Sequence, residues 1–222
     1  MSQGGKLGHI GFMLSVVIPA LNAQTSLPRC FDSLLAATVR GVVREVIVAD
    51  GGSGDDTLII SDAAGARIKK SGKSRASQLA AGAEAARQDW ILFLYPETAL
   101  EPGWDVEAEA FITHSTLEKP RAAAFRFGLD EFEASARRSE ALAALRCWAF
   151  KRPHGEQGLL IPKRLFRQIG GYRDVAREDV DIVRRIGPRR LVMLRARAVV
   201  KRQAVLATSG TAGQGGLSVA RG

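Results

Sequence analysis

The sequence predicts an α/β fold, with a mostly parallel central sheet flanked by helices, and three observations lead to that prediction. Short apolar runs typical of buried strands alternate with segments of helical periodicity. The 222 residues suffice for one such domain with a substantial core. Two predicted strands are followed by an acid, Asp50 and Glu97, at the strand end where open α/β sheets bind their ligands.

The first half of the chain supplies four predicted strands, each followed by a helix. The last of these strands is the most apolar in the chain, which predicts a central position in the sheet. Helical spacing, a serine N-cap and prolines in first turns indicate the helices. The strands are predicted at 14–19, 45–49, 66–69 and 90–94, and the helices at 26–41, 56–64, the back of 72–86 and 102–114.

The second half contains a long basic amphipathic helix among shorter elements. Its apolar side suits either the protein core or a membrane surface. The predicted strands are 122–127, 159–161 and 191–200, and the predicted helices are 131–150, 165–169 and a last one that starts at Glu178. We expect one strand antiparallel to the others. The expected organisation is a flexible leader at 1–13, a single domain at 14–206 and a disordered tail at 207–222.

Composition narrows the classes of partner. Lysine and arginine number 32 against 23 acids, a net charge of +9, which suits nucleic acid, anionic lipid or an anionic small substrate. Because the usual nucleic-acid modules are not visible and aromatics are few, we expect no nucleic-acid partner. The two cysteines are far apart, which favours a reducing, cytoplasmic compartment. No apolar run approaches the ~18 residues that span a membrane.

The segment 48–57, V-A-D-G-G-S-G-D-D-T, joins a buried strand to the next helix through a glycine-rich turn. A carboxylate at the strand end, here Asp50, suits a neutral donor such as a nucleobase imide or a ribose hydroxyl, or a metal. In the alternative interpretation, Asp50 only bonds the amides of its own turn. The residues alone leave both interpretations open.

Two further segments carry charge where helices begin. Lys73 and Arg75 precede an alanine-rich helix, where free amides and cations can bind a phosphate group, although the segment is not a Walker A loop. Such a basic helix start is also compatible with a solvated surface. Glu178 and Asp179 open a later helix, and acids are stabilised there whether or not they take part in function.

Seven segments, in this order, resemble a family 2 glycosyltransferase of the GT-A fold, and within it a small bacterial group. The resemblance extends from about residue 14 to residue 200. The segments are V-V-I-P-A-L-N (16–22), V-A-D-G-G-S-G-D-D-T (48–57), S-R-A-S-Q-L-A-A-G-A (74–83), I-L-F-L-Y-P-E-T (91–98), G-E-Q-G (155–158), G-G-Y (170–172) and E-D (178–179).

This resemblance implies inverting transfer from a nucleoside diphosphate sugar to an acceptor hydroxyl, assisted by Mg²⁺ or Mn²⁺. Asp179, with Glu178 beside it, falls where the family has its catalytic base, and Glu97 falls on the last position of the metal-binding D-x-D motif. The implied nucleotide-sugar-binding residues are Pro19, Ala20, Asn22, Asp50, Gly51, Ser53, Asp55, Arg75, Gln78, Tyr95 and Gln157. The chain departs from the family at Tyr95, which replaces the first acid of the motif, and at Ala80, where relatives often carry asparagine.

Three matters stay open at the level of sequence. The acceptor is not specified, and a lipid-linked acceptor with peripheral contact at the inner face of the membrane agrees with the basic surplus. A sugar-nucleotidyltransferase is the first alternative function, although residues 16–22 lack the phosphate-gripping loop typical of that class. A catalytically inactive nucleotide-binding or membrane-surface relative is the second.

Overall fold

The computed structural model describes residues 13–115, 119–130 and 157–201. The strands are β1 (Leu14–Ala20), β2 (Val43–Asp50), β3 (Arg67–Lys70), β4 (Trp90–Phe93), β5 (Thr98–Leu100), β6 (Ala122–Asp130), β7 (Leu159–Pro162) and β8 (Leu191–Lys201). The helices are α1 (Leu27–Val39), α2 (Thr57–Ala63), α3 (Arg75–Ala85), α4 (Trp104–Thr113), α6 (Lys163–Gln168) and α7 (Glu178–Ile186). The elements predicted within these residues are confirmed, with ends shifted by a few residues.

The strands form one sheet in the order β3-β2-β1-β4-β7-β6-β8-β5. The first four run parallel, and β4 lies near the middle of the sheet, as its apolar sequence predicts. Strand β7 is antiparallel to both β4 and β6, and β5 is antiparallel to β8. The prediction of one antiparallel strand was therefore incomplete, because the three-residue strand β5 is too short to show a strand pattern.

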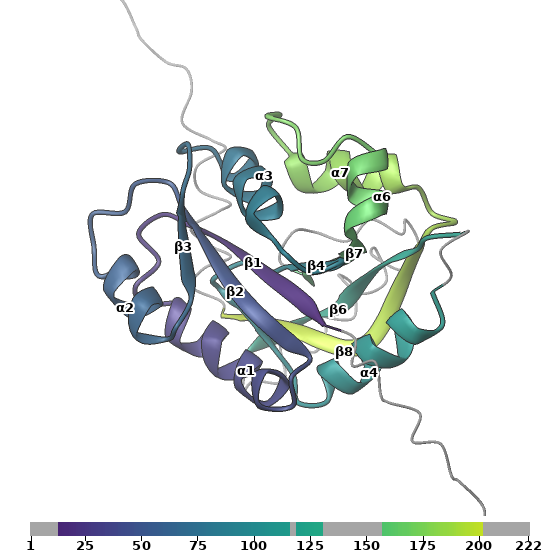
Figure 1. Ribbon diagram of the computed structural model, residues 1–222, viewed down its shortest axis with the longest axis horizontal. Helices are drawn as coiled ribbons and strands as arrows, with labels where there is room; N and C mark the ends of the chain where they lie inside the picture. The colour runs from purple at the N-terminus through teal and green to yellow at the C-terminus, as the bar shows by residue number, and fades with distance from the viewer. Residues whose placement is uncertain (1–12, 116–118, 131–156, 202–222) are drawn as a thin grey trace, which may run out of the picture.

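Helices cover both faces of the sheet, as Figure 1 shows with α1, α2 and α4 on one side and α3, α6 and α7 on the other. Alternate residues of β1 supply the two cores, since neighbouring side chains on a strand point to opposite faces. Val16 and Ile18 pack with α1 and α4, whereas Val17 packs with α3, α6 and α7. The carboxyl ends of β1, β2 and β4 thus lie between helices fixed by burial on either face.

The predictions for residues 1–12, for the helix at 131–150 and for the tail at 207–222 concern positions outside the described residues. Within the described part, none of the helices is both long enough and apolar enough to cross a membrane.

At the other end of the strands, a hydrogen-bonded network centred on Glu45 links β1, β2, β3 and the segment after α3. The Oε1 atom of Glu45 accepts bonds from the Ser15 hydroxyl and the Arg87 amide, both at 2.6 Å. Its Oε2 atom accepts a bond from Arg67 at 2.8 Å. Burial raises the pKa of Glu45, but the bonds from Ser15 and Arg87 and the charge of Arg67 outweigh burial, so that the pKa lies below its ordinary value.

We expect Glu45→Gln to lower the free energy of unfolding at pH 7 by about 1–2 kcal/mol, since hydrogen bonds to a charged group are lost. Because the folded-state pKa is depressed, this contribution is present above the unfolded pKa of about 4.3 and is lost as the pH falls through the folded value. The difference between wild type and variant, measured by urea unfolding from pH 7 to pH 3, should therefore shrink toward low pH.

The matched control for this prediction is Asp62→Asn, which changes an exposed acid on α2. It should leave the unfolding free energy nearly unchanged across the same pH range. A Glu45→Gln difference as large at pH 3 as at pH 7 would contradict the assigned ionic contribution.

Candidate active site

The turn after β2 is organised by Asp50, whose surface is only 4% exposed. Its carboxylate accepts hydrogen bonds from the Gly52 amide at 2.9 Å, from the Ser53 amide at 3.2 Å and from the Ser53 hydroxyl at 2.5 Å. These are the bonds of the turn interpretation, and they engage both carboxylate oxygens. The orientation of Asp50 is therefore fixed, and its contact with a nucleobase stays a prediction.

Hydrogen bonds also tie this turn to the loop after β1. The Asn22 amide donates to the Ser53 hydroxyl, and the Asn22 side-chain oxygen accepts from the Gly54 amide, both at 2.9 Å. Two residues after Asn22, the Gln24 amide donates to Asp55 at 3.1 Å. Asn22 adopts a φ of +54°, a left-handed conformation that asparagine tolerates better than most residues. Four of the predicted nucleotide-binding residues, Asn22, Asp50, Ser53 and Asp55, thus form one connected unit.

The start of α3 packs against the same turn. Ser74 caps the helix by accepting a bond from the Ser77 amide at 3.2 Å. Gln78, one turn into the helix, is buried and donates to the Lys73 carbonyl at 3.1 Å. A Cβ atom at Gly51 would lie 2.3 Å from the Nε2 atom of Gln78, so the absence of a side chain at Gly51 permits this close packing.

The other side of the α3 start meets the end of β4. The guanidinium carbon of Arg75 lies 4.7 Å from the centroid of the Tyr95 ring, a cation–π arrangement. Tyr95 is 4% exposed, and its hydroxyl donates to Oε1 of Glu178 at 3.2 Å. The first turns of α3 and α7, distant in sequence, are therefore joined through one side chain.

The pKa shifts of Arg75 and Tyr95 indicate that acidic side chains lie near both residues. Partial desolvation lowers the pKa of Arg75, but Tyr95, Glu178 and Glu97 outweigh it and raise the pKa. Burial is the main cause that raises the pKa of Tyr95, to which Glu178 and Asp179 add.

The pKa values of two neighbouring side chains, Tyr172 and Cys30, are raised in part by the same acids. Burial, followed by the charges of Glu178 and Asp179, raises the pKa of Tyr172. Burial, followed by the charge of Glu97, raises the pKa of the Cys30 thiol, which lies 3.8 Å from the Tyr95 carbonyl oxygen. Tyr172 was not predicted as a site residue, although it ends the G-G-Y segment noted in the sequence.

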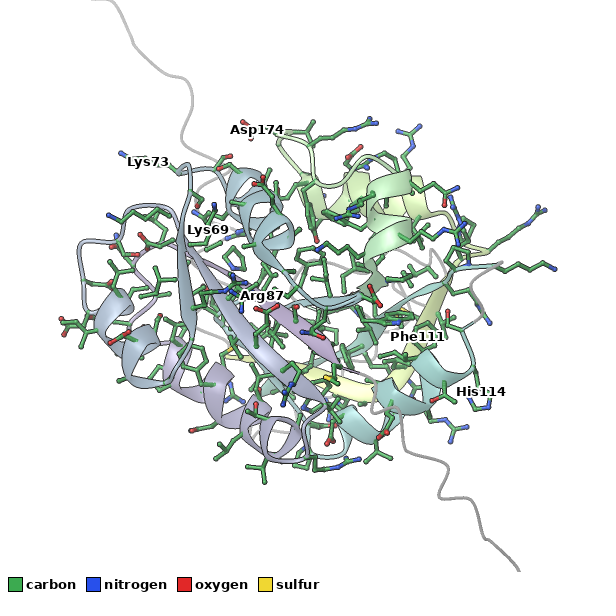
Figure 2. The ribbon with its side chains drawn as sticks, in the orientation of Figure 1. Lys69, Lys73, Arg87, Phe111, His114 and Asp174 are labelled. Atoms are coloured by element: carbon green, nitrogen blue, oxygen red, sulfur yellow. The ribbon has the colours of Figure 1, made fainter. Side chains whose placement is uncertain are left out.

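Figure 2 shows the two loops that precede these helices: Lys73 before α3 and Asp174 before α7 lie along the same edge of the molecule. Contacts join the ends of β1, β2 and β4 to the starts of α3 and α7, and Pro19 and Ala20 are buried at the end of β1. Gln157 differs: it is fully buried and donates to the Phe125 carbonyl at 3.0 Å, a contact that serves the core.

Glu97 is the predicted ligand for a divalent cation. Among the described residues, no three His, Cys, Asp or Glu side chains are close enough to form a metal site together. Glu97, half-buried in the turn after β4, offers a carboxylate of the kind Mg²⁺ and Mn²⁺ prefer. Since Mg²⁺ is commonly held by one or two carboxylates together with substrate phosphates, this donor set fits a cation that arrives with a diphosphate.

Comparison with known proteins bears on these features. Residues 15–105 match the model of glycosyl transferase family 2. The predicted family 2 resemblance is thereby confirmed. This family 2 region includes the turn after β2, the start of α3 and the end of β4, but not α7.

Curated relatives match this chain over part of its length. Glucosyl-3-phosphoglycerate synthase of Mycobacterium tuberculosis is 47% identical over 58 residues, which cover 26% of this chain and 18% of that enzyme. The PGL/p-HBAD biosynthesis glycosyltransferase of Mycobacterium bovis is 32% identical over 95 residues, which cover 40% of this chain and 36% of the relative. The chain thus matches well under half of the length of either relative.

Solved structures extend the fold comparison over most of the chain. The M. tuberculosis glucosyl-3-phosphoglycerate synthase in complex with Mn²⁺, UDP and glucosyl-3-phosphoglycerate superposes with a TM-score of 0.62 at 21% identity, covering 87% of this chain and 71% of that one. The same enzyme with Mg²⁺ and UDP gives a TM-score of 0.62 at 22% identity, with the same coverage. The predicted GT-A fold is confirmed.

Proposed function

We propose that this protein transfers a sugar from a nucleoside diphosphate sugar to an acceptor hydroxyl, with inversion at the anomeric carbon. One observation carries the proposal: the first turn of α3 contacts the Asp50 turn through Gln78 and the Tyr95 ring after β4 through Arg75, and the Tyr95 hydroxyl donates to Glu178 at the start of α7. Groups suited to bind a nucleoside and a diphosphate therefore lie at the same edge of the sheet as a group suited to take a proton from a hydroxyl.

The nucleoside would lie against the Asp50 turn and the loop after β1. Asp50 supplies only acceptor oxygens, which suits an imide N–H or a ribose hydroxyl. Arg75, at the start of α3, offers a planar fork of donors that matches phosphate oxygens. Uracil is the first candidate base, because one similarly folded enzyme has been crystallised with UDP.

Glu97 would hold a divalent cation together with the donor phosphates, and the bound cation would supply charge neutralisation for the leaving diphosphate. On the acceptor side, Asp179 would accept the proton of the attacking hydroxyl as general base. Retention of configuration would instead call for a carboxylate nucleophile or another front-face route.

The acceptor is proposed only as a hydroxyl compound. A similarly folded enzyme has been crystallised with phosphoglyceric acid, which is a small anionic acceptor candidate. A lipid-linked acceptor, cytoplasmic location and peripheral membrane contact remain expectations from the basic composition.

Isothermal titration calorimetry tests the donor side directly. We expect UDP to bind at least about tenfold more tightly with Mn²⁺ than with EDTA, because the cation bridges carboxylate and diphosphate. UMP, which lacks the second phosphate, is the matched control and should show little dependence on Mn²⁺. Absence of binding heat with UDP and GDP and their sugars, with Mn²⁺ present, would contradict the proposed function.

A further inference from the structure

We propose that Tyr95 is a positioning residue that holds the donor-side Arg75 and the acceptor-side Glu178 in one fixed arrangement. This inference rests on the proposed function for the meaning of the two sides. The contacts that it invokes belong to the folded chain itself and are measurable without a substrate.

The side chain of Tyr95 makes two different contacts. Its ring face carries the guanidinium of Arg75 at 4.7 Å, and its hydroxyl donates to Glu178 at 3.2 Å. Since a buried hydroxyl without a partner is costly, the bond to the carboxylate fixes the start of α7 relative to β4. The ring contact does the same for the start of α3.

The backbone of Tyr95 is itself anchored. Its carbonyl accepts a bond from the Thr98 amide at 3.0 Å and lies 3.8 Å from the Cys30 sulfur of α1. Pro96 follows, which restricts the conformation of Tyr95. Tyr95 is thus a fixed point on the sheet, toward which two more exposed helix starts are oriented.

The two contacts are separable by mutation. Tyr95→Phe keeps the aromatic face for Arg75 and removes the hydroxyl, which donates to Glu178 and also interacts with Arg75. Tyr95→Leu removes both contacts. The control Tyr172→Phe deletes the same atom from a tyrosine that packs against the same hydrophobic core cluster and whose ring lies on Phe93 with centroids 5.0 Å apart.

Hydrogen–deuterium exchange tests the arrangement without substrate. In Tyr95→Phe, amides at 178–182 should exchange about three- to tenfold faster, because local opening of α7 becomes easier, while those at 75–79 should change less because the aromatic face for Arg75 is kept. Tyr95→Leu should accelerate both segments, and Tyr172→Phe neither. Unchanged exchange at 178–182 in a folded Tyr95→Phe protein, verified by its thermal unfolding, would overturn the proposal.

Kinetics then test the consequence for transfer. Tyr95→Phe should lower kcat about tenfold with the donor KM within twofold, because a displaced acceptor side affects the reaction more than donor binding. In a double-mutant cycle, Glu178→Ala should add little to the loss in Tyr95→Phe, since both remove one bond. If the fold loss of kcat in the double variant equalled the product of the two single losses, the proposal would be overturned. A wild type without turnover would instead count against the proposed function, and the exchange experiment would still decide the role of Tyr95.

Discussion

Asp179→Asn is expected to lower kcat by about 10²- to 10⁴-fold, the usual contribution of a general base. Asparagine is nearly the same size as aspartate but cannot accept a proton from the acceptor hydroxyl at neutral pH. The donor side, built from the Asp50 turn and the start of α3, is untouched by the substitution. The Kd of UDP with Mn²⁺, measured by calorimetry, should therefore stay within about twofold of the wild-type value.

The matched control is Asp181→Asn on the same helix. Asp181 is paired with Arg185 at 2.5 Å within α7. Its substitution weakens a local ion pair and should leave kcat within about twofold of wild type. If Asp179→Asn lost donor binding and turnover to the same extent, Asp179 would be a structural residue and the general base would have to be sought elsewhere.

Gly82→Ala is expected to lower the free energy of unfolding by about 2–3 kcal/mol, a typical result of overpacking a core. A Cβ atom at Gly82 would lie 2.2 Å from Cγ1 of Val17, which is fully buried in β1. Alanine favours helix by about 1 kcal/mol over glycine, and the overlap outweighs this gain. Because α3 carries Arg75 and Gln78, its displacement should also weaken UDP binding.

Urea unfolding measures this effect, with Gly54→Ala as the matched control, since a Cβ atom at Gly54 meets nothing within 4 Å. Val17→Ala in the Gly82→Ala background should restore part of the lost stability, because it removes the overlapping methyl groups. A Gly82→Ala protein as stable as wild type would show that α3 can move away from β1 without loss.

The strands that alternate with helices were predictable because each carries its own apolar pattern. The parallel arrangement of β1, β2, β3 and β4 follows from that alternation. Strand β5 was missed because Thr98–Leu100 forms only through its pairing with β8, about a hundred residues later. Pairing between distant segments depends on the whole fold, and a three-residue sequence is too short to show which segment it will pair with.

The candidate site was predictable to a different degree. The sequence placed Asp50 and Glu97 at strand ends and Arg75 at a helix start, which local patterns suffice to show. It could not show that Gln78 packs on Gly51, or that the Tyr95 ring lies between Arg75 and Glu178, because these contacts depend on how α3 and α7 pack on the sheet. The complete burial of Gln157 was hidden for the same reason.

The cross-bonded loops after β1 and β2 have a thermodynamic consequence. Bonds within the chain hold the two loops together, from Asn22 to Ser53, from Gly54 to Asn22 and from Gln24 to Asp55, so a nucleotide that binds there finds its contact surface built in advance. Little chain entropy remains to be lost in those loops on association. Most of the conformational entropy lost on binding would then be lost by the nucleotide.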